Sequence, residues 1–87
     1  MANITMYTTA YCPYCNNAER LLQSKGVTEI NKIRVDESPD LKLAMMEKTG
    51  RRTVPQIYID ERHVGGFDDL RALVLSGELE PLLAGCA

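Results

Sequence analysis

The 87-residue chain lacks four features that would mark particular classes of protein. It has no large excess of charge, since 10 Lys and Arg face 12 Asp and Glu, which argues against non-specific nucleic-acid binding through neutralised phosphates. It has only three cysteines, unevenly placed, which are too few for a secreted scaffold held together by disulfides. No apolar run approaches the roughly 18 residues of a membrane span, and residues 1–9 lack the apolar stretch of a signal peptide. We therefore expect a cytoplasmic protein.

Repeats, linkers and low-complexity stretches are also absent from the sequence. A chain of this length, with 45% hydrophobic residues, can bury one core but is too small for a second binding lobe. We therefore expect residues 1–87 to form a single domain whose functional residues share one surface.

The order of helix and strand signals predicts one α/β domain. Gly26 and Gly50 end the first two predicted helices, and Asp60 and Glu61 leave so short a link that the last two strands must form an antiparallel hairpin. The predicted strands are residues 4–7, 30–35, 56–59 and 62–64; the predicted helices run from the cysteine loop to residue 25, from 39 to 49 with Ser38 as N-cap, and from 67 to 76, followed by a helical turn at 78–83. The order is β-α-β-α-β-β-α.

Two of the cysteines form the motif Cys12-Pro13-Tyr14-Cys15 between the first strand and the first helix. Two thiols at this spacing can each attack a disulfide and can close into one. The motif therefore indicates a dithiol redox site, although zinc knuckles and chance also produce it.

The residues around the motif predict which cysteine attacks. With Pro13 at the first helical position, Cys12 would sit at the N-cap, where free backbone N–H groups and the helix dipole favour a thiolate. Cys15 falls on one helical stripe with Ala18 and Leu22, the stripe that should pack on the sheet. We expect Cys12 to attack and Cys15, more shielded, to resolve a mixed disulfide.

A zinc site is an alternative interpretation of the same cysteines. Cys12, Cys15, His63 and Cys86 would supply four ligands of acceptable type. Pro13, however, fits a helix start better than a zinc knuckle, and the other two ligands do not form a pair in the sequence. We predict no metal site, with His63 a solvated hairpin residue and Cys86 an exposed thiol that could also link two copies.

Two further motifs accompany the cysteines in a characteristic order and spacing. They are Thr53-Val54-Pro55 before the third predicted strand and Gly65-Gly66-Phe67-Asp68-Asp69-Leu70 at the start of the third predicted helix. With all three motifs, the chain resembles the short bacterial dithiol glutaredoxins of the glutaredoxin 3 type over nearly its whole length. The resemblance implies a thioredoxin-like fold, with a four-stranded mixed sheet flanked by three helices, a cis peptide before Pro55, and glutathione as the reductant.

The resemblance also implies a glutathione site beside the thiols. In the family, the backbone of the residue matching Val54 pairs with the cysteinyl unit of glutathione, next to the cis-proline. The start of the third helix would bind the γ-glutamyl carboxylate, while Asp68 or Asp69 would accept from its ammonium group. The expected glutathione-binding residues are Tyr14, Thr53, Val54, Pro55, Gly66, Phe67, Asp68 and Asp69.

One position departs from the family pattern. Many relatives carry a lysine where this chain has Thr9, and that lysine adds positive charge near the attacking thiol and near glutathione. The helix dipole alone, worth up to ~2 kcal/mol, would lower the pKa of Cys12 by roughly 1.5 from ~8.5. Arg51 or Arg52 is the expected substitute that binds the glycyl carboxylate of glutathione.

The predicted function is the reduction of protein disulfides and glutathione mixed disulfides by the Cys12/Cys15 pair. The expected enzyme is a monomer with glutathione as co-substrate and no permanently bound cofactor; its partners are disulfide-containing or glutathionylated proteins, not nucleic acids or membranes.

Two alternatives stay open. One is a carrier of an iron–sulfur cluster ligated by Cys12 and glutathione between two subunits, although Pro13 and Cys15 resemble the dithiol type more. The other is an electron donor reduced directly by a thioredoxin reductase.

Overall fold

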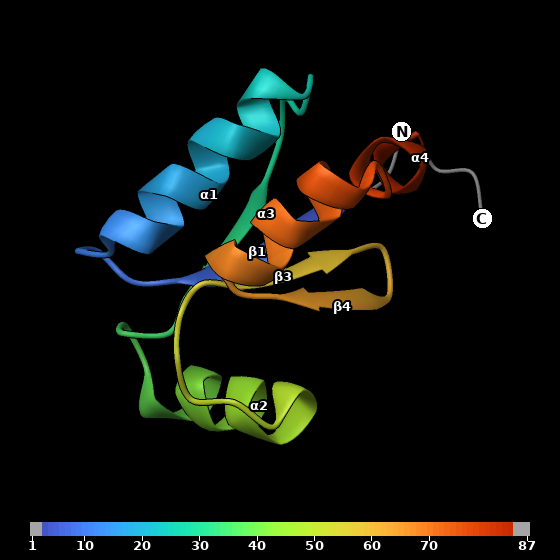
Figure 1. The fold of residues 1–87 in the computed structure, drawn as a ribbon. Helices are drawn as coiled ribbons and strands as arrows, with labels where there is room; N and C mark the ends of the chain where they lie inside the picture. The colour runs from blue at the N-terminus through green and yellow to red at the C-terminus, as the bar shows by residue number, and fades with distance from the viewer. Residues whose placement is uncertain (1–2, 85–87) are drawn as a thin grey trace.

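The computed structural model describes residues 3–84, which form one mixed sheet and the helices around it (Figure 1). The elements are β1 (Ile4–Thr8), α1 (Pro13–Ser24), β2 (Asn31–Arg34), α2 (Pro39–Thr49), β3 (Gln56–Ile59), β4 (Arg62–Gly65), α3 (Phe67–Ser76) and α4 (Leu79–Leu83). This order confirms the predicted one, with α4 as the expected helical turn. None of the helices within residues 3–84 is long and apolar enough to cross a membrane.

The four strands lie in the order β2-β1-β3-β4. The β1–β2 pair is parallel, whereas the β1–β3 and β3–β4 pairs are antiparallel, so the sheet is mixed as predicted. Strand β2 is shorter than expected, although the Val35 N–H still donates to the Thr8 carbonyl over 3.0 Å. Helices α1 and α3 cover one face of the sheet and α2 covers the other (Figure 1).

Both faces of the central strands are therefore buried. On the side of α1 and α3, Leu22 and Leu70 pack against Ile57, and all three are fully buried. On the side of α2, Met45 packs with Tyr7 and Tyr58. Because neighbours cover both faces, all four residues of β3 are buried and the strand shows no alternation of polar and apolar residues.

The sheet topology brings three loops to one edge. Strand β1 ends there and leads to α1, while the antiparallel β3 begins there, with Gln56 opposite Tyr7. Strand β4 returns to the same edge, with Gly65 opposite Ile57, and leads directly into α3. The cysteine motif, the segment before β3 and the start of α3 therefore meet at this edge, although some 50 residues of chain separate the first from the last.

Candidate active site

The cysteine motif forms the first turn of α1. Cys12 is the N-cap residue, with an extended backbone, and Pro13 occupies the first helical position. The Cys12 Sγ accepts a hydrogen bond from the backbone N–H of Cys15 over 3.1 Å. The two cysteines are joined in a disulfide, with their Cα atoms 5.1 Å apart. The predicted placement of Cys12 at the mouth of the helix is therefore observed.

The two cysteines differ less in exposure than expected. In this disulfide form, Cys12 is 8% exposed and Cys15 is 3% exposed. The side chains beside them are much more open, since Tyr11 is 96% exposed and Tyr14 is 61% exposed. Cys15 lies on the buried stripe of α1 with Ala18 and Leu22, as predicted.

A groove of about 230 Å³ lies next to the disulfide. It runs between the segment that precedes β3 and the start of α3, and the Cys12 Sγ lies 3.9 Å from the carbonyl oxygen of Val54 at its border. The peptide bond between Val54 and Pro55 is cis, as the resemblance implied. The lining residues are Tyr14, Arg51, Thr53, Val54, Pro55, Gln56, Gly66, Phe67, Asp68 and Asp69. All eight residues expected from the sequence are thus brought together, along with Arg51 and Gln56.

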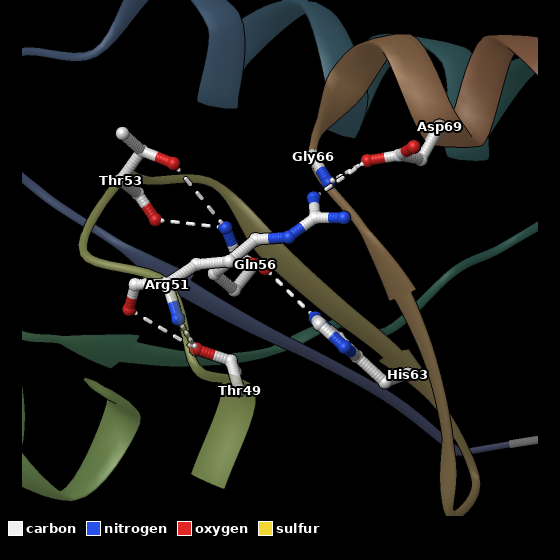
Figure 2. A network of polar contacts seen from close by, with 7 residues as sticks. All are labelled: Thr49, Arg51, Thr53, Gln56, His63, Gly66 and Asp69. Carbon is white, nitrogen blue, oxygen red and sulfur yellow. Dashed lines mark hydrogen bonds and ion pairs between the residues drawn. The ribbon is translucent and has the colours of Figure 1, made fainter. Parts of the chain in front are cut away.

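The start of α3 is held by Asp69, whose Oδ2 accepts from the Gly66 N–H and from the Arg51 Nη1, each over 2.9 Å (Figure 2). The hydrogen bond from Arg51, and then that from Gly66, lower the pKa of Asp69 below its ordinary value. The carboxylate of Asp69 therefore already caps α3 and forms an ion pair, while Asp68 is exposed on the groove. Of the two candidate arginines, Arg51 lines the groove and Arg52 is absent from its lining.

The segment before β3 is tied to the hairpin by Gln56 (Figure 2). Its Nε2 donates to the Thr53 carbonyl over 3.0 Å, and its Oε1 accepts from the Nε2 of His63 over 2.8 Å. The prediction of a solvated His63 is wrong, because its ring is half-buried and stacks on Tyr58 with ring centroids 4.9 Å apart. Burial, and then the charge of Arg51, lower the pKa of His63.

Sequence reasoning missed the role of Gln56. The available signal was its position in a strand that the fold buries on both faces, since a polar side chain there must find hydrogen-bond partners. Gln56 and Tyr58 share one face of β3, and Tyr58 is paired with His63 across the hairpin.

The loop before Cys12 is held by Asp36, which lies just after β2. Asp36 accepts from the Ala10 N–H over 3.1 Å and from Arg34 over 2.7 and 2.8 Å. The hydrogen bond from Arg34 lowers the pKa of Asp36 well below its usual range. Thr9, the position that departs from the family pattern, lines a separate hollow on the Cys15 side, which shares no lining residue with the groove.

The four residues of the zinc alternative are engaged elsewhere or lie outside the described part of the chain. Cys12 and Cys15 are joined to each other, His63 contacts Gln56, and Cys86 lies outside the described residues. Within residues 3–84, no three His, Cys, Asp or Glu side chains are grouped to hold a metal ion.

A mixed sheet covered on both faces, with a Cys-X-X-Cys pair capping α1 beside a cis-proline segment, defines a thioredoxin-like dithiol redox protein. The glutaredoxin family model matches residues 4–64 of the chain. A glutaredoxin of Neisseria meningitidis serogroup A is 52% identical over 83 residues, covering 95% of this chain and 98% of that protein. Glutaredoxin 3 of Escherichia coli K12 is 48% identical over 83 residues, covering 95% and 99%. The crystal structure of a buckwheat glutaredoxin–glutathione complex superimposes with a TM-score of 0.87 at 30% identity, covering 98% of this chain and 79% of that one.

The chain belongs to the glutaredoxin family. Glutaredoxins are thiol–disulfide oxidoreductases, and the observed Cys12–Cys15 disulfide shows that the two thiols lie close enough to form the redox pair of such an enzyme. The comparisons thus confirm both the resemblance and the class of reaction inferred from the sequence.

Proposed function

We propose that glutathione is the reducing co-substrate of this oxidoreductase, with Cys12 as the attacking thiol, Cys15 as the resolving thiol and the groove as the glutathione site. The observation that carries the proposal is the position of the Cys12 Sγ, which caps α1 and lies 3.9 Å from the Val54 carbonyl on the groove. A glutathione sulfur bonded to Cys12 would therefore leave the rest of the tripeptide beside the residues that line the groove. The complex that the buckwheat glutaredoxin forms with glutathione supports the choice of glutathione as the ligand.

The groove matches the charges of glutathione. The γ-glutamyl unit carries a carboxylate, which suits the free backbone N–H groups at the start of α3, and an ammonium group, which suits a carboxylate. Asp68 is the better acceptor for that ammonium, because Asp69 is already bound to Gly66 and Arg51. Arg51 is the better partner for the glycyl carboxylate, since it lines the groove and a guanidinium has five donors, of which the bond to Asp69 uses one.

The reaction runs by thiol–disulfide exchange. The Cys12 thiolate attacks a glutathionylated protein, the bond between the two substrate sulfurs breaks, and the protein leaves as a thiolate while glutathione stays on Cys12. A second glutathione thiolate then attacks that glutathione sulfur, which releases oxidised glutathione and restores the Cys12 thiolate.

A protein disulfide follows a second route. Cys12 forms a mixed disulfide with one substrate sulfur, and Cys15 then attacks the Cys12 sulfur, releasing the reduced substrate and forming the observed disulfide. Two glutathione molecules reduce that disulfide and become oxidised glutathione. Glutaredoxin potentials of about −200 to −230 mV lie close to a glutathione pool near −220 to −260 mV, which makes this electron flow feasible.

We further propose that the enzyme acts as a monomer in the cytoplasm on disulfide-containing and glutathionylated proteins. A reducing compartment keeps a Cys-X-X-Cys pair in the dithiol form that attack requires. Sedimentation of the reduced protein checks the oligomeric state.

The test is turnover of a glutathionylated peptide coupled to glutathione reductase and NADPH. We expect Cys12→Ser to abolish all turnover, whereas Cys15→Ser should keep removal of glutathione and lose reduction of protein disulfides. Active Cys12→Ser with inactive Cys15→Ser would exchange the two roles. Turnover with thioredoxin reductase in place of glutathione and its reductase would favour the direct electron-donor alternative, and visible absorbance after anaerobic reconstitution would favour the iron–sulfur alternative.

A further inference from the structure

A chain of side-chain hydrogen bonds joins the β3–β4 hairpin to the segment that borders Cys12 (Figure 2). His63 on β4 donates to the Oε1 of Gln56 over 2.8 Å, and the Nε2 of Gln56 donates to the Thr53 carbonyl over 3.0 Å. The same Nε2 lies 3.4 Å from the Thr53 Oγ1. We call His63, Gln56 and Thr53 the amide bridge, because the Gln56 amide connects the other two.

The centre of the amide bridge is completely buried. Gln56 is 0% exposed, so its amide cannot exchange a lost partner for bulk water. A buried amide left with an unsatisfied oxygen is destabilised, and it would turn or shift to find another donor. Since the same amide donates to Thr53 from its other end, such a shift would also release the Thr53 carbonyl.

The Thr53 end of the amide bridge lies in the groove. Thr53 and Val54 precede β3 and lie outside the sheet ladder, which begins at Gln56. The bond from Gln56 therefore fixes a segment that has no strand pairing of its own. Val54, the next residue, carries the carbonyl that lies beside the Cys12 Sγ.

The His63 end of the amide bridge is held by the hairpin. The imidazole stacks on Tyr58 with an interplanar angle of 23°, and it is half-buried. A carbonyl oxygen only accepts, so His63 must present a proton on Nε2 to Gln56. His63 itself is absent from the lining of the groove, and any effect on a ligand must pass through Gln56.

We propose that His63 is a positioning residue for the glutathione moiety of the substrate, acting through Gln56 on the Thr53–Val54 segment. The inference rests on the proposed function and adds a residue that lies outside the groove. Loss of His63 should weaken binding of the glutathione moiety while leaving the reactivity of Cys12 unchanged.

The experiment compares steady-state turnover of a glutathionylated peptide in the unaltered protein and in His63→Leu. We expect the KM for that peptide to rise about tenfold in His63→Leu, the size of effect that one unsatisfied buried hydrogen-bonding group produces. The kcat at saturating peptide, and the rate at which uncharged iodoacetamide alkylates Cys12, should stay within about twofold. His63→Gln, which restores a donor, should bring the KM most of the way back.

Val64→Ala is the matched control, because Val64 lies on the same strand, is also half-buried, packs on the core cluster that contains Leu22 and Leu70, and takes part in none of the hydrogen bonds of the amide bridge. We expect it to lower thermal stability without raising the KM. An equal rise in KM for Val64→Ala would show a merely structural effect and would overturn the inference. If the unaltered protein had no glutathione-coupled turnover, the proposed function would fail; normal turnover with an unchanged KM in His63→Leu would overturn the inference alone.

A measurement on the unaltered protein tests the geometry directly, even if His63→Leu does not fold. His63 is the only histidine, so its imidazole signals in ¹⁵N–¹H NMR spectra need no further assignment. We expect the neutral ring to carry its proton on Nε2, and the Gln56 side-chain amide protons to exchange more slowly when S-methylglutathione is bound. A proton on Nδ1, or exchange that the ligand leaves unchanged, would overturn the inference.

Discussion

Asp68 and Asp69 are adjacent in the sequence but play different parts at the start of α3. Asp69 binds Gly66 and Arg51, whereas Asp68 is exposed on the groove. We expect Asp68→Asn to weaken binding of S-methylglutathione several-fold with little change in thermal stability. Asp69→Asn should reduce both, because it weakens a helix cap and an ion pair. Calorimetric titration and thermal unfolding of the two variants check this, and equal stability losses would contradict the assignment.

Gly65 adopts a φ of +112°, and a Cβ at this position would lie 2.3 Å from the Oδ2 of Asp69. Gly77 also has a positive φ, +78°, but a Cβ there would meet no atom within 4 Å. The two glycines therefore separate backbone strain from steric conflict. We expect Gly77→Ala to lower the free energy of unfolding by about 1–2 kcal/mol, and Gly65→Ala to lower it further and to weaken glutathione binding. Urea unfolding and ligand titration measure both effects, and indistinguishable variants would contradict the clash.

At the scale of the element, α1 places its N-terminal N–H groups around the sulfur that it caps. We predict that reduced Cys12 is alkylated with a pH midpoint below the ~8.5 of a free thiol. The measurement is the rate of reaction with iodoacetamide against pH in Cys15→Ser, with an unfolded peptide of residues 8–17 carrying the same substitution as control. A midpoint near 8.5 in both samples would show that the helix contributes nothing.

Helix ends that carry a proline or a glycine were predictable from the sequence. Pro13 and Gly50 marked the start of α1 and the end of α2, and both positions are as expected. Ser38 does occupy the N-cap of α2, but its side chain makes no capping hydrogen bond. Strand β2 was predicted too long, because its alternation is imperfect and strand pairing rather than composition decides where it ends.

At the scale of the whole molecule, three groups within residues 3–84, His63, Asp36 and Asp69, have lowered pKa values that link stability to pH below neutrality. Burial lowers the pKa of His63 from 6.5, so the unfolded chain binds this proton more readily than the folded protein does. The hydrogen bonds that lower the pKa values of Asp36 and Asp69 stabilise the fold above the unfolded value of 3.8.

We therefore expect the free energy of unfolding to fall as the pH drops through 6.5 toward the lower folded pKa of His63, and again below 3.8. Urea unfolding at closely spaced pH values measures both declines. His63→Gln should remove the first decline and keep the second. A first decline that survives in His63→Gln would show that another group titrates there.

The groove was largely predictable because three short motifs carry most of its lining, and the topology brings them to one edge of the sheet. The resemblance supplied the eight expected residues, but it could not choose between Asp68 and Asp69 or between Arg51 and Arg52. In the structure, Arg51 contacts Asp69, and this contact separates Arg51 from Arg52 and Asp69 from Asp68. The amide bridge was not predictable from spacing, because it depends on which buried polar atoms face each other across a hairpin.

Apart from Tyr14, the residues that line the groove come from stretches of the chain that do not carry the two sulfurs, and Cys12 approaches the groove at the carbonyl of Val54. Substitutions on α3 or in the loop before β3 can therefore change which disulfide substrates bind without changing the reactivity of Cys12 and Cys15. Evolution or protein engineering can therefore change the affinity of the groove for its ligand separately from the reactivity of the two cysteines.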